Sequence, residues 1–246
     1  MAKRKMNKTR TTKKPARKIN KVSRSKAARV SRPKRASAPK VRKSKMFEIP
    51  HYPQTEEFTS SAACALMVLK YLNPKTQMKK DDEFKIWQEA VNGSVWHGSR
   101  YGLAYALSKR GAKPQIISNA KEEGYEKKLA VYEGVNIETL SAAFKEIRQK
   151  AKDAKIKESY GITTINTLKK HLNGGKIPIV VVNANALNPY LEDSPHWVVV
   201  KGYDNDTFYI NDPYSDSTIT MAPDAFRGAL GYDNESHMIL VSARKK

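Results

Sequence analysis

The sequence at residues 52–64 reads Tyr-Pro-Gln-Thr-Glu-Glu-Phe-Thr-Ser-Ser-Ala-Ala-Cys and leads directly into an apolar run that ends at Asn-Pro (73–74). The hydroxyl side chains at 59–61 can supply an N-cap, and a proline cannot continue a helix. We therefore predict a helix over 62–72, with the polar stretch immediately before it held at the helix N-terminus.

Two later stretches place polar residues beside apolar strands. Ser-Pro-His-Trp-Val-Val-Val-Lys-Gly-Tyr (194–203) has a histidine at the start of a buried strand, and Phe-Tyr-Ile-Asn-Asp-Pro-Tyr (208–214) has an aspartate at the end of the next strand. A helix N-terminus that faces a His–Asp pair can activate a nucleophile, because the helix dipole and the imidazole lower its pKa while the carboxylate orients the ring. Gln54 offers a donor to an oxyanion.

Along the rest of the chain, the spacing of apolar residues is first typical of helices and later typical of strands. Apolar residues three and four apart predict an amphipathic helix over 138–157. Further helices are expected at 82–91, at 102–109, and from Thr163 or Thr164 to Gly174-Gly175. Strands are expected at 116–117, 177–183, 197–203, 207–211, 217–221 and 238–242. Helices first and an antiparallel sheet later predict an α+β fold.

The charge is concentrated at one end of the chain. Residues 1–45 hold 20 of the 46 Lys and Arg residues and no acid, because the first carboxylate belongs to Glu48. They also lack aromatic residues and any apolar period, so we expect a disordered basic tail at 1–45 and a folded domain at 46–246. The domain can bury a real hydrophobic core.

Such a tail should bind nucleic acid through phosphate contacts that salt weakens, without reading bases. The alternatives are a solvated tail or, in a eukaryotic host, nuclear-localisation patches at 13–18 and 32–35. We expect a cytoplasmic, nucleoid-associated protein, or a nuclear one in a eukaryote. The cations expected to bind are Lys3, Arg4, Lys5, Lys13, Lys14, Arg17, Lys18, Arg32, Lys34 and Arg35.

Several classes of protein are disfavoured. Cys64 is the only cysteine, which rules out an intrachain disulfide framework and a cysteine-based zinc cluster. The longest apolar run, 177–182, is far too short to cross a bilayer, so no membrane association is expected. The sequence spacing of His51, His171 and His237 gives no set of metal ligands, and there is no phosphate-binding glycine motif, so we expect neither a metal nor a cofactor.

The three polar stretches resemble the papain-like, bacteriocin-processing cysteine peptidases of family C39, and most closely a cytoplasmic C39-like subgroup. The resemblance spans about residues 50–215 and includes an acidic-x-x-x-Trp-x-Glu-Ala helix from Glu83 to Ala90 and Tyr-Gly-Leu-Ala at 101–104. It implies a papain-like fold in which Ser60 occupies the nucleophile position, His196 is the general base, and Asp212 orients the histidine. Gln54 takes the oxyanion-hole position.

This sequence departs from the family pattern at the nucleophile. Ser60 stands where the family has cysteine, and Cys64 lies one helical turn later, about 6 Å further along the helix and in the expected core. A serine hydroxyl stays protonated in a site built for a thiolate. We therefore expect first a non-catalytic protein that recognises an extended peptide, such as a protein terminus, and is tethered to nucleic acid.

Two other functions remain open. The domain could be an active peptidase or acyl-transfer hydrolase that uses Ser60, or Cys64, with His196 and Asp212. It could also be an architectural nucleic-acid-binding protein in which the folded part only carries the tail. His97 could line the cleft, although a loop histidine is more often a surface residue, and Trp197 is expected in the core.

Overall fold

Three apolar strands form the middle of the sheet: β4 (Lys176–Asn183), β5 (Pro195–Tyr203) and β8 (His237–Ser242). The computed structural model describes residues 44–92 and 95–242. Nearly every side chain of these strands is buried, which explains why the sequence there is a continuous apolar run rather than an alternation. The strands predicted at 177–183, 197–203 and 238–242 are confirmed.

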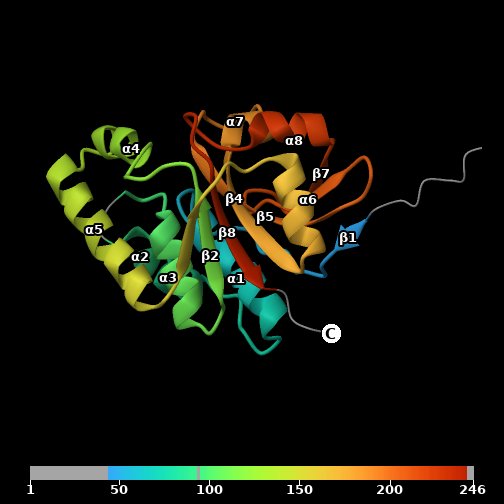
Figure 1. The fold of residues 1–246 in the computed structure, drawn as a ribbon, viewed down its shortest axis with the longest axis horizontal. Coiled ribbons are helices and arrows are strands. Elements are labelled where there is room, and N and C mark those ends of the chain that lie inside the picture. The colour runs from blue at the N-terminus through green and yellow to red at the C-terminus, as the bar shows by residue number, and fades with distance from the viewer. Residues whose placement is uncertain (1–43, 93–94, 243–246) are drawn as a thin grey trace, which may run out of the picture. The chain divides into compact units, whose positions relative to one another are not determined.

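The other strands are β1 (Lys45–Met46), β2 (Pro114–Ser118), β3 (Lys157–Tyr160), β6 (Phe208–Asn211) and β7 (Thr218–Met221). The full sheet has the strand order β3-β2-β8-β4-β5-β6-β7, and β1 pairs with β5. The helices are α1 (Ser60–Leu72), α2 (Lys80–Val91), α3 (Arg100–Lys109), α4 (Glu126–Tyr132), α5 (Ile137–Asp153), α6 (Ile165–Asn173), α7 (Ala184–Leu187) and α8 (Pro223–Ala229). In Figure 1, α2, α3 and α5 lie on the left, α6 lies on the right, and α8 lies at the top.

The prediction of an α+β fold is confirmed, but the sheet is not antiparallel throughout. β2 and β3 run parallel, while β2 and β8 run antiparallel. Parallel neighbours need a long crossover, and here the segment that contains α4 and α5 supplies it. β3 is an edge strand with four exposed residues, so it carries no apolar pattern and was not predicted.

Helix α1 is an interior helix that positions the first polar stretch. Its first ten residues are buried, and it packs against β5. It begins at Ser60, two residues before the predicted start. Thr59 does not cap it as expected, because the Thr59 Oγ1 accepts a hydrogen bond from the Glu56 backbone N–H at 3.2 Å and donates to the Glu56 carbonyl oxygen at 2.9 Å.

The amphipathic helix α5 is shorter than predicted. Its buried face is formed by Leu140, Phe144, Ile147 and Ala151, as the spacing indicated. It ends at Asp153 rather than at 157 because Lys155 has a positive φ of 57°, a left-handed conformation that closes helices. Within the described residues, no helix is long and apolar enough to span a bilayer.

Candidate active-site cleft

Ser60 lies at the first position of α1, where the helix meets the start of β5. It is buried, and its Oγ accepts a hydrogen bond of 3.4 Å from the Trp197 backbone N–H. Among the described residues, no hydrogen bond joins this hydroxyl to the His196 ring. The helix N-terminus and the histidine strand therefore meet as predicted, but the serine is bonded to the backbone of the strand rather than to its imidazole.

His196 and Asp212 form a close pair on adjacent strands. His196 Nε2 lies 2.7 Å from Asp212 Oδ1, and both residues are buried. Asp212 also accepts hydrogen bonds from the backbone N–H of Tyr214 and the hydroxyl of Ser215. Burial alone would raise the pKa of the Asp212 carboxyl, but the bonds from His196, Tyr214 and Ser215 outweigh it and hold the pKa below its ordinary value.

A cleft of about 280 Å³ opens beside this pair. Gln54, Ser60 and His196 all line it, while Asp212 lies behind the imidazole. Among the described residues, the charged side chains that line the cleft are both acidic, Glu57 and Glu192. The aromatic side chains of Phe58, Tyr190 and Tyr214 also contribute to its walls.

Gln54 lies in the cleft wall, but its amide is already engaged. Its Nε2 donates to the Glu57 carbonyl oxygen at 3.0 Å, and its Oε1 is buried without a hydrogen bond. The Gln54 backbone N–H donates to the Pro213 carbonyl oxygen at 2.8 Å, which holds this loop beside Asp212. The Gln54 side chain therefore lines the cleft in which it was predicted to stabilise an oxyanion. Its amide N–H, however, bonds to the protein backbone.

Glu83 of α2 is hydrogen-bonded to both sides of the loop that carries Gln54. Its carboxylate is fully buried and accepts hydrogen bonds from the Tyr52 hydroxyl at 3.1 Å and the Thr55 backbone N–H at 3.0 Å. Burial and the Glu83 charge raise the pKa of Tyr52. The family resemblance pointed to this acidic position, but only the structure shows that it fixes the two ends of the segment that carries Gln54.

His97 lines the cleft and is not a surface loop residue. Its ring stacks on Trp197 with an interplanar angle of 17°, and its Nε2 lies 3.1 Å from the Tyr125 hydroxyl. Burial, together with the charges of His196 and His237, lowers the pKa of His97 to about 3, so the ring is neutral. Trp197 is fully buried in the core, as expected.

Cys64 is part of the core, as predicted. It is fully buried, and its Sγ donates to the Trp197 carbonyl oxygen at 3.2 Å. Burial raises the pKa of the thiol well above its ordinary value, with a further contribution from the Asp212 charge. Cys64 does not line the cleft, so it has neither the access nor the thiolate character of a nucleophile.

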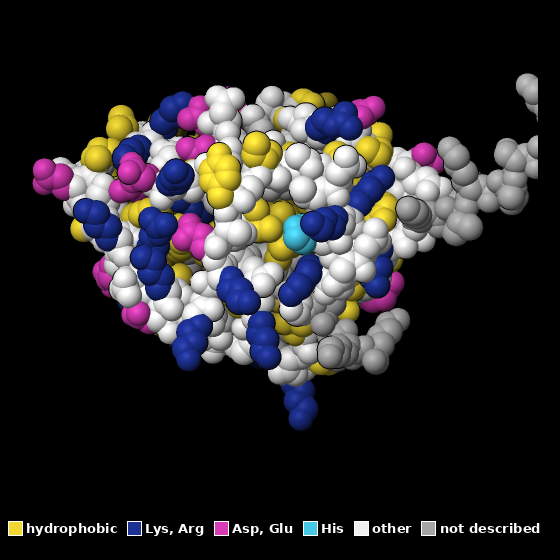
Figure 2. All heavy atoms as spheres, in the orientation of Figure 1, with side chains coloured by type: hydrophobic (Ala, Val, Ile, Leu, Met, Phe, Trp, Pro, Cys, Tyr) yellow, Lys and Arg dark blue, Asp and Glu magenta, His cyan; other side chains and the backbone are white. Residues whose placement is uncertain are grey.

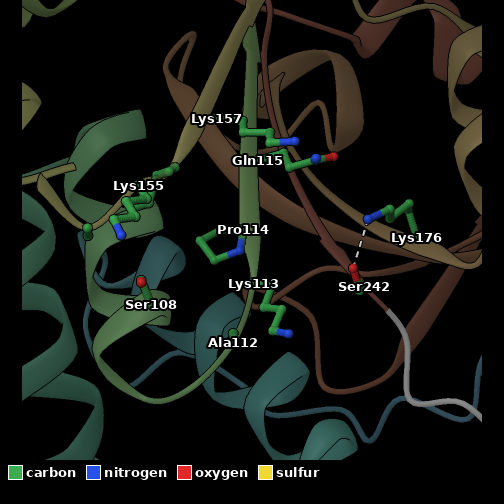
Figure 3. Close-up of a pocket in the computed structure, with 11 residues that line it drawn as sticks. Ser108, Ala112, Lys113, Pro114, Gln115, Lys155, Lys157, Lys176 and Ser242 are labelled. Carbon is green, nitrogen blue, oxygen red and sulfur yellow. Dashed lines mark hydrogen bonds between the residues drawn. The ribbon is translucent and has the colours of Figure 1, made fainter. Parts of the chain in front are cut away.

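The ten tail cations expected to contact nucleic acid, from Lys3 to Arg35, lie outside the described residues. Lys and Arg side chains gather over the lower half of the face in Figure 2, where few acids appear. A separate pocket of about 330 Å³ is lined by Lys113, Lys155, Lys157 and Lys176, and the described part of the chain contributes no acid to its lining (Figure 3). Lys176 Nζ donates to Ser242 Oγ at 2.7 Å.

The chain is similar to several solved structures. In solved structures, the chain is similar to a double-glycine-motif protease from an AMS/PCAT transporter in complex with its leader peptide, with 15% identity, coverage of 80% of this chain and 95% of that chain, and a TM-score of 0.45. It is also similar to a C39-like peptidase from Bacillus anthracis, with 15% identity, coverage of 83% and 100%, and a TM-score of 0.47. A third is xylellain, a cysteine protease from Xylella fastidiosa, with 14% identity, coverage of 82% and 86%, and a TM-score of 0.44.

The model of the Peptidase C39-like family matches residues 49–230, most of the chain. This range contains the start of α1, the histidine of β5 and the aspartate that follows β6. The chain therefore belongs to the Peptidase C39-like family.

Proposed function

We propose that the cleft binds an extended peptide without hydrolysing it. The observation that carries this proposal is the hydrogen bonding of Ser60, whose Oγ is bonded to the Trp197 backbone N–H and, among the described residues, not to the imidazole. A serine nucleophile needs a base within hydrogen-bond reach to take its proton during attack, whereas a cysteine can be stored as a thiolate.

The oxyanion position favours the same conclusion. The Gln54 amide donates to the Glu57 carbonyl oxygen and would have to leave it to stabilise an oxyanion. His196 Nε2 bonds to Asp212, which is the arrangement of a working triad and leaves Nδ1 for a nucleophile. The His–Asp pair is thus in place, while Ser60 and Gln54 are bonded to the backbone instead of to the reacting groups.

The cleft walls also suggest which peptides would bind. Glu57 and Glu192 supply negative charge, and Tyr190, whose side chain is almost fully exposed, offers an aromatic face to a cation. We therefore propose a peptide ligand that carries Lys or Arg next to its central residues. Electrostatic complementarity of this kind sets specificity and association rate more than total affinity.

Fluorescence polarisation with a labelled Lys/Arg-rich peptide and its Glu-substituted counterpart tests the proposal. The basic peptide should bind more tightly, and Glu57→Gln with Glu192→Gln should weaken it by about 5- to 20-fold, as expected for two partly exposed ion pairs. Asp224→Asn, an exposed acid of α8, is the matched control.

Mass spectrometry of the same peptide after incubation checks for cleavage. Cleavage by the wild type that is absent from Ser60→Ala would favour the rival function, a hydrolase that uses Ser60. Equal binding of the basic and acidic peptides would contradict the proposed specificity.

We also propose that the chain associates with nucleic acid through its phosphates, and that this places it on the nucleoid. The charge of residues 1–45 supports this proposal, and so does the lysine pocket of Figure 3, because its described lining has four cations and no acid, which favours a polyanion. The lysines of this pocket belong to the folded part, so variants can test them without changing the tail.

Salt titration of duplex-DNA binding separates the two contributions. Removal of residues 2–43, which leaves β1 intact, should abolish most of the binding and most of its salt dependence. Lys113→Gln, Lys155→Gln and Lys157→Gln together should lower the slope of log K against log salt by about 2 to 3, since each phosphate contact contributes about 0.9. Lys75→Gln, Lys79→Gln and Lys85→Gln remove the same charge from another exposed surface. Equal effects of the two triple variants would refute a specific lysine site.

A further inference from the structure

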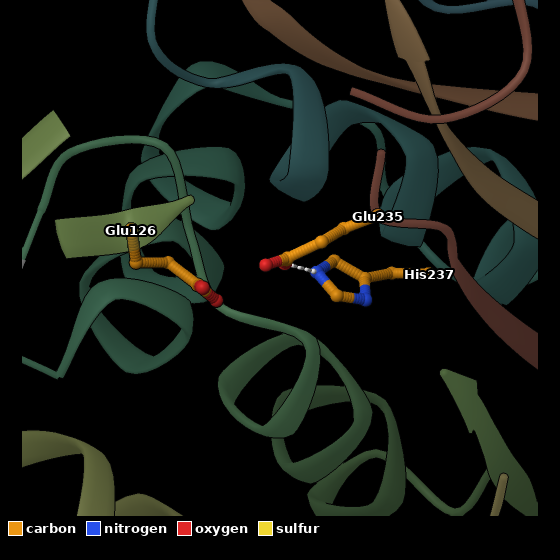
Figure 4. A group of neighbouring side chains, drawn as sticks. All are labelled: Glu126, Glu235 and His237. Carbon is orange, nitrogen blue, oxygen red and sulfur yellow. Dashed lines mark ion pairs between the residues drawn. The ribbon is translucent and has the colours of Figure 1, made fainter. Parts of the chain in front are cut away.

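A group of potential metal ligands lies outside the cleft. It consists of Glu126 at the start of α4, His237 at the start of β8, and Glu235 two residues before it. One ligand atom of each residue lies within 4.8 Å of the other two, and the three side chains converge in Figure 4. Glu126 and His237 are almost fully buried, while the Glu235 side chain is 20% exposed.

The hydrogen bonds of His237 define which nitrogen is available. Its Nδ1 lies 2.9 Å from Ser118 Oγ, and that hydroxyl donates its own proton to the Ala120 carbonyl oxygen at 3.1 Å. With the Ser118 hydroxyl proton directed to the Ala120 carbonyl oxygen, His237 Nδ1 carries the ring proton and Nε2 keeps a lone pair. A ring N–H bonded to a protein oxygen is how metal-binding histidines are commonly oriented.

In this tautomer, three hydrogen-bond acceptors face one another without a hydrogen-bond donor. His237 Nε2, Glu126 Oε2 and Glu235 Oε2 are buried, and none of them makes a hydrogen bond to a described residue, although Nε2 lies 3.4 Å from Glu235 Oε2. Buried acceptors left in this state are costly. A proton on one carboxyl would serve one neighbour only, whereas a divalent cation placed among the three ligand atoms would serve all of them.

The nearby cation Arg100 gives no hydrogen bond to any of these three atoms. Arg100 is fully buried, and its Nη1 lies 3.4 Å from the other Glu126 oxygen, Oε1, while its Nη2 donates to the Glu122 carbonyl oxygen at 2.6 Å. The positive charge of Arg100 thus balances the negative charge of one of the two carboxylates, Glu126. The negative charge of Glu235 remains on the cluster. A divalent ion would leave the group of four side chains with one net positive charge.

The backbone makes room for the exposed member of the cluster. Gly124 has a positive φ of 63°, and a Cβ added there would lie 2.1 Å from Glu235 Oε2. The Glu235 carboxylate therefore occupies space that only a glycine leaves open. This contact gives a way to move the carboxylate without changing any ligand.

We propose that Glu126, Glu235 and His237 bind one divalent transition-metal ion, with Zn²⁺ as the best match. One imidazole and two carboxylates suit borderline ions, and three protein ligands leave a coordination position for water on the side where Glu235 is exposed. The ligand atoms must contract by a few tenths of an ångström to bind at about 2.0–2.2 Å. The ion would fasten α4 to β8. Because Tyr125, next to Glu126, bonds to His97, it would also fix one wall of the cleft.

Equilibrium dialysis of the full chain against Zn²⁺ after chelation tests this site, with bound metal measured by elemental analysis. Residues 1–45 contain no His, Cys, Asp or Glu and so add no ligand of these types. We expect one equivalent of Zn²⁺ in the wild type and at least tenfold weaker binding in Glu235→Gln and Gly124→Ala. Both variants leave the two buried ligands intact, and circular dichroism would verify their folding.

Glu122→Gln removes an exposed carboxylate from the same loop and should bind as the wild type does. Replacement of Zn²⁺ by Co²⁺ should give the wild type a visible ligand-field spectrum that Glu235→Gln lacks. The proposal is overturned if the wild type binds no more Zn²⁺ than Glu235→Gln, or if Glu122→Gln loses the ion to the same extent. Peptide binding in the cleft is measured separately, so either result leaves the proposed function open to its own test.

Discussion

Replacing Glu83 should reveal how strongly one buried carboxylate holds the loop that carries Gln54. Glu83→Gln keeps the shape of the side chain but removes its charge and turns one acceptor into a donor. Because Glu83 accepts bonds from both the Tyr52 hydroxyl and the Thr55 backbone N–H, the amide must face one of these donors with another donor. A charge-assisted bond contributes about 1.5–3 kcal/mol and a buried donor without a partner costs about 1–3 kcal/mol, while the lower cost of burying an amide offsets part of the sum. We expect the free energy of unfolding to fall by about 2–4 kcal/mol.

Urea denaturation followed by tryptophan fluorescence measures this loss, and polarisation with the basic peptide reports on the cleft. Asp82→Asn is the matched control, because Asp82 precedes Glu83 on α2 and makes only a long ion pair of 3.8 Å with exposed Lys85. It should change stability by less than about 0.5 kcal/mol. If Glu83→Gln is as stable as Asp82→Asn, the inference that this carboxylate holds the loop is wrong.

Three further results are expected. Cys64 should react with a thiol reagent only when the chain unfolds, so the labelling rate should follow urea concentration; fast labelling of the native protein would show that the thiol is accessible. The pKa of Asp212 is lowered in the folded state, so its contribution to stability is complete above about pH 3.9 and is lost as pH falls through the folded value. The stability gap between wild type and Asp212→Asn should therefore shrink on acidification, and a constant gap from pH 7 to pH 3 would contradict this. Gly102→Ala would place a Cβ 2.0 Å from the Ala90 carbonyl oxygen and should destabilise the α2–α3 contact by about 1–3 kcal/mol in a thermal melt, whereas an unchanged melting temperature would refute the close approach.

The elements that sequence alone predicts are those whose burial is dictated by their own residues. The apolar strands β4, β5 and β8 and the amphipathic helix α5 have such patterns, and the structure confirms them. The edge strand β3 has four exposed residues, so its pairing with β2 depends on chain connection rather than on apolar period. The short helices α4, α7 and α8 are equally weak in pattern.

The candidate site likewise has features that the sequence predicts and features that it does not. Ser60 and His196 were predicted to lie together because they stand at the starts of elements with strong patterns, and the family resemblance added Gln54 from the loop before α1. All three line one cleft. The hydrogen bonds of these residues could not be predicted, since the Gln54 amide turns to a carbonyl three residues away. The Glu126 and His237 cluster joins residues more than a hundred positions apart, so no sequence spacing indicated it.

The most direct test of a peptide-binding cleft without catalysis is the hydrolysis rate of one bound basic peptide by wild type, Ser60→Ala and Ser60→Cys, with products quantified by mass spectrometry. We expect no difference between wild type and Ser60→Ala, and turnover by Ser60→Cys that His196→Ala abolishes, because a thiol can use the existing His–Asp pair as a thiolate. Turnover by the wild type that Ser60→Ala removes would contradict the proposal and establish Ser60 as a working nucleophile.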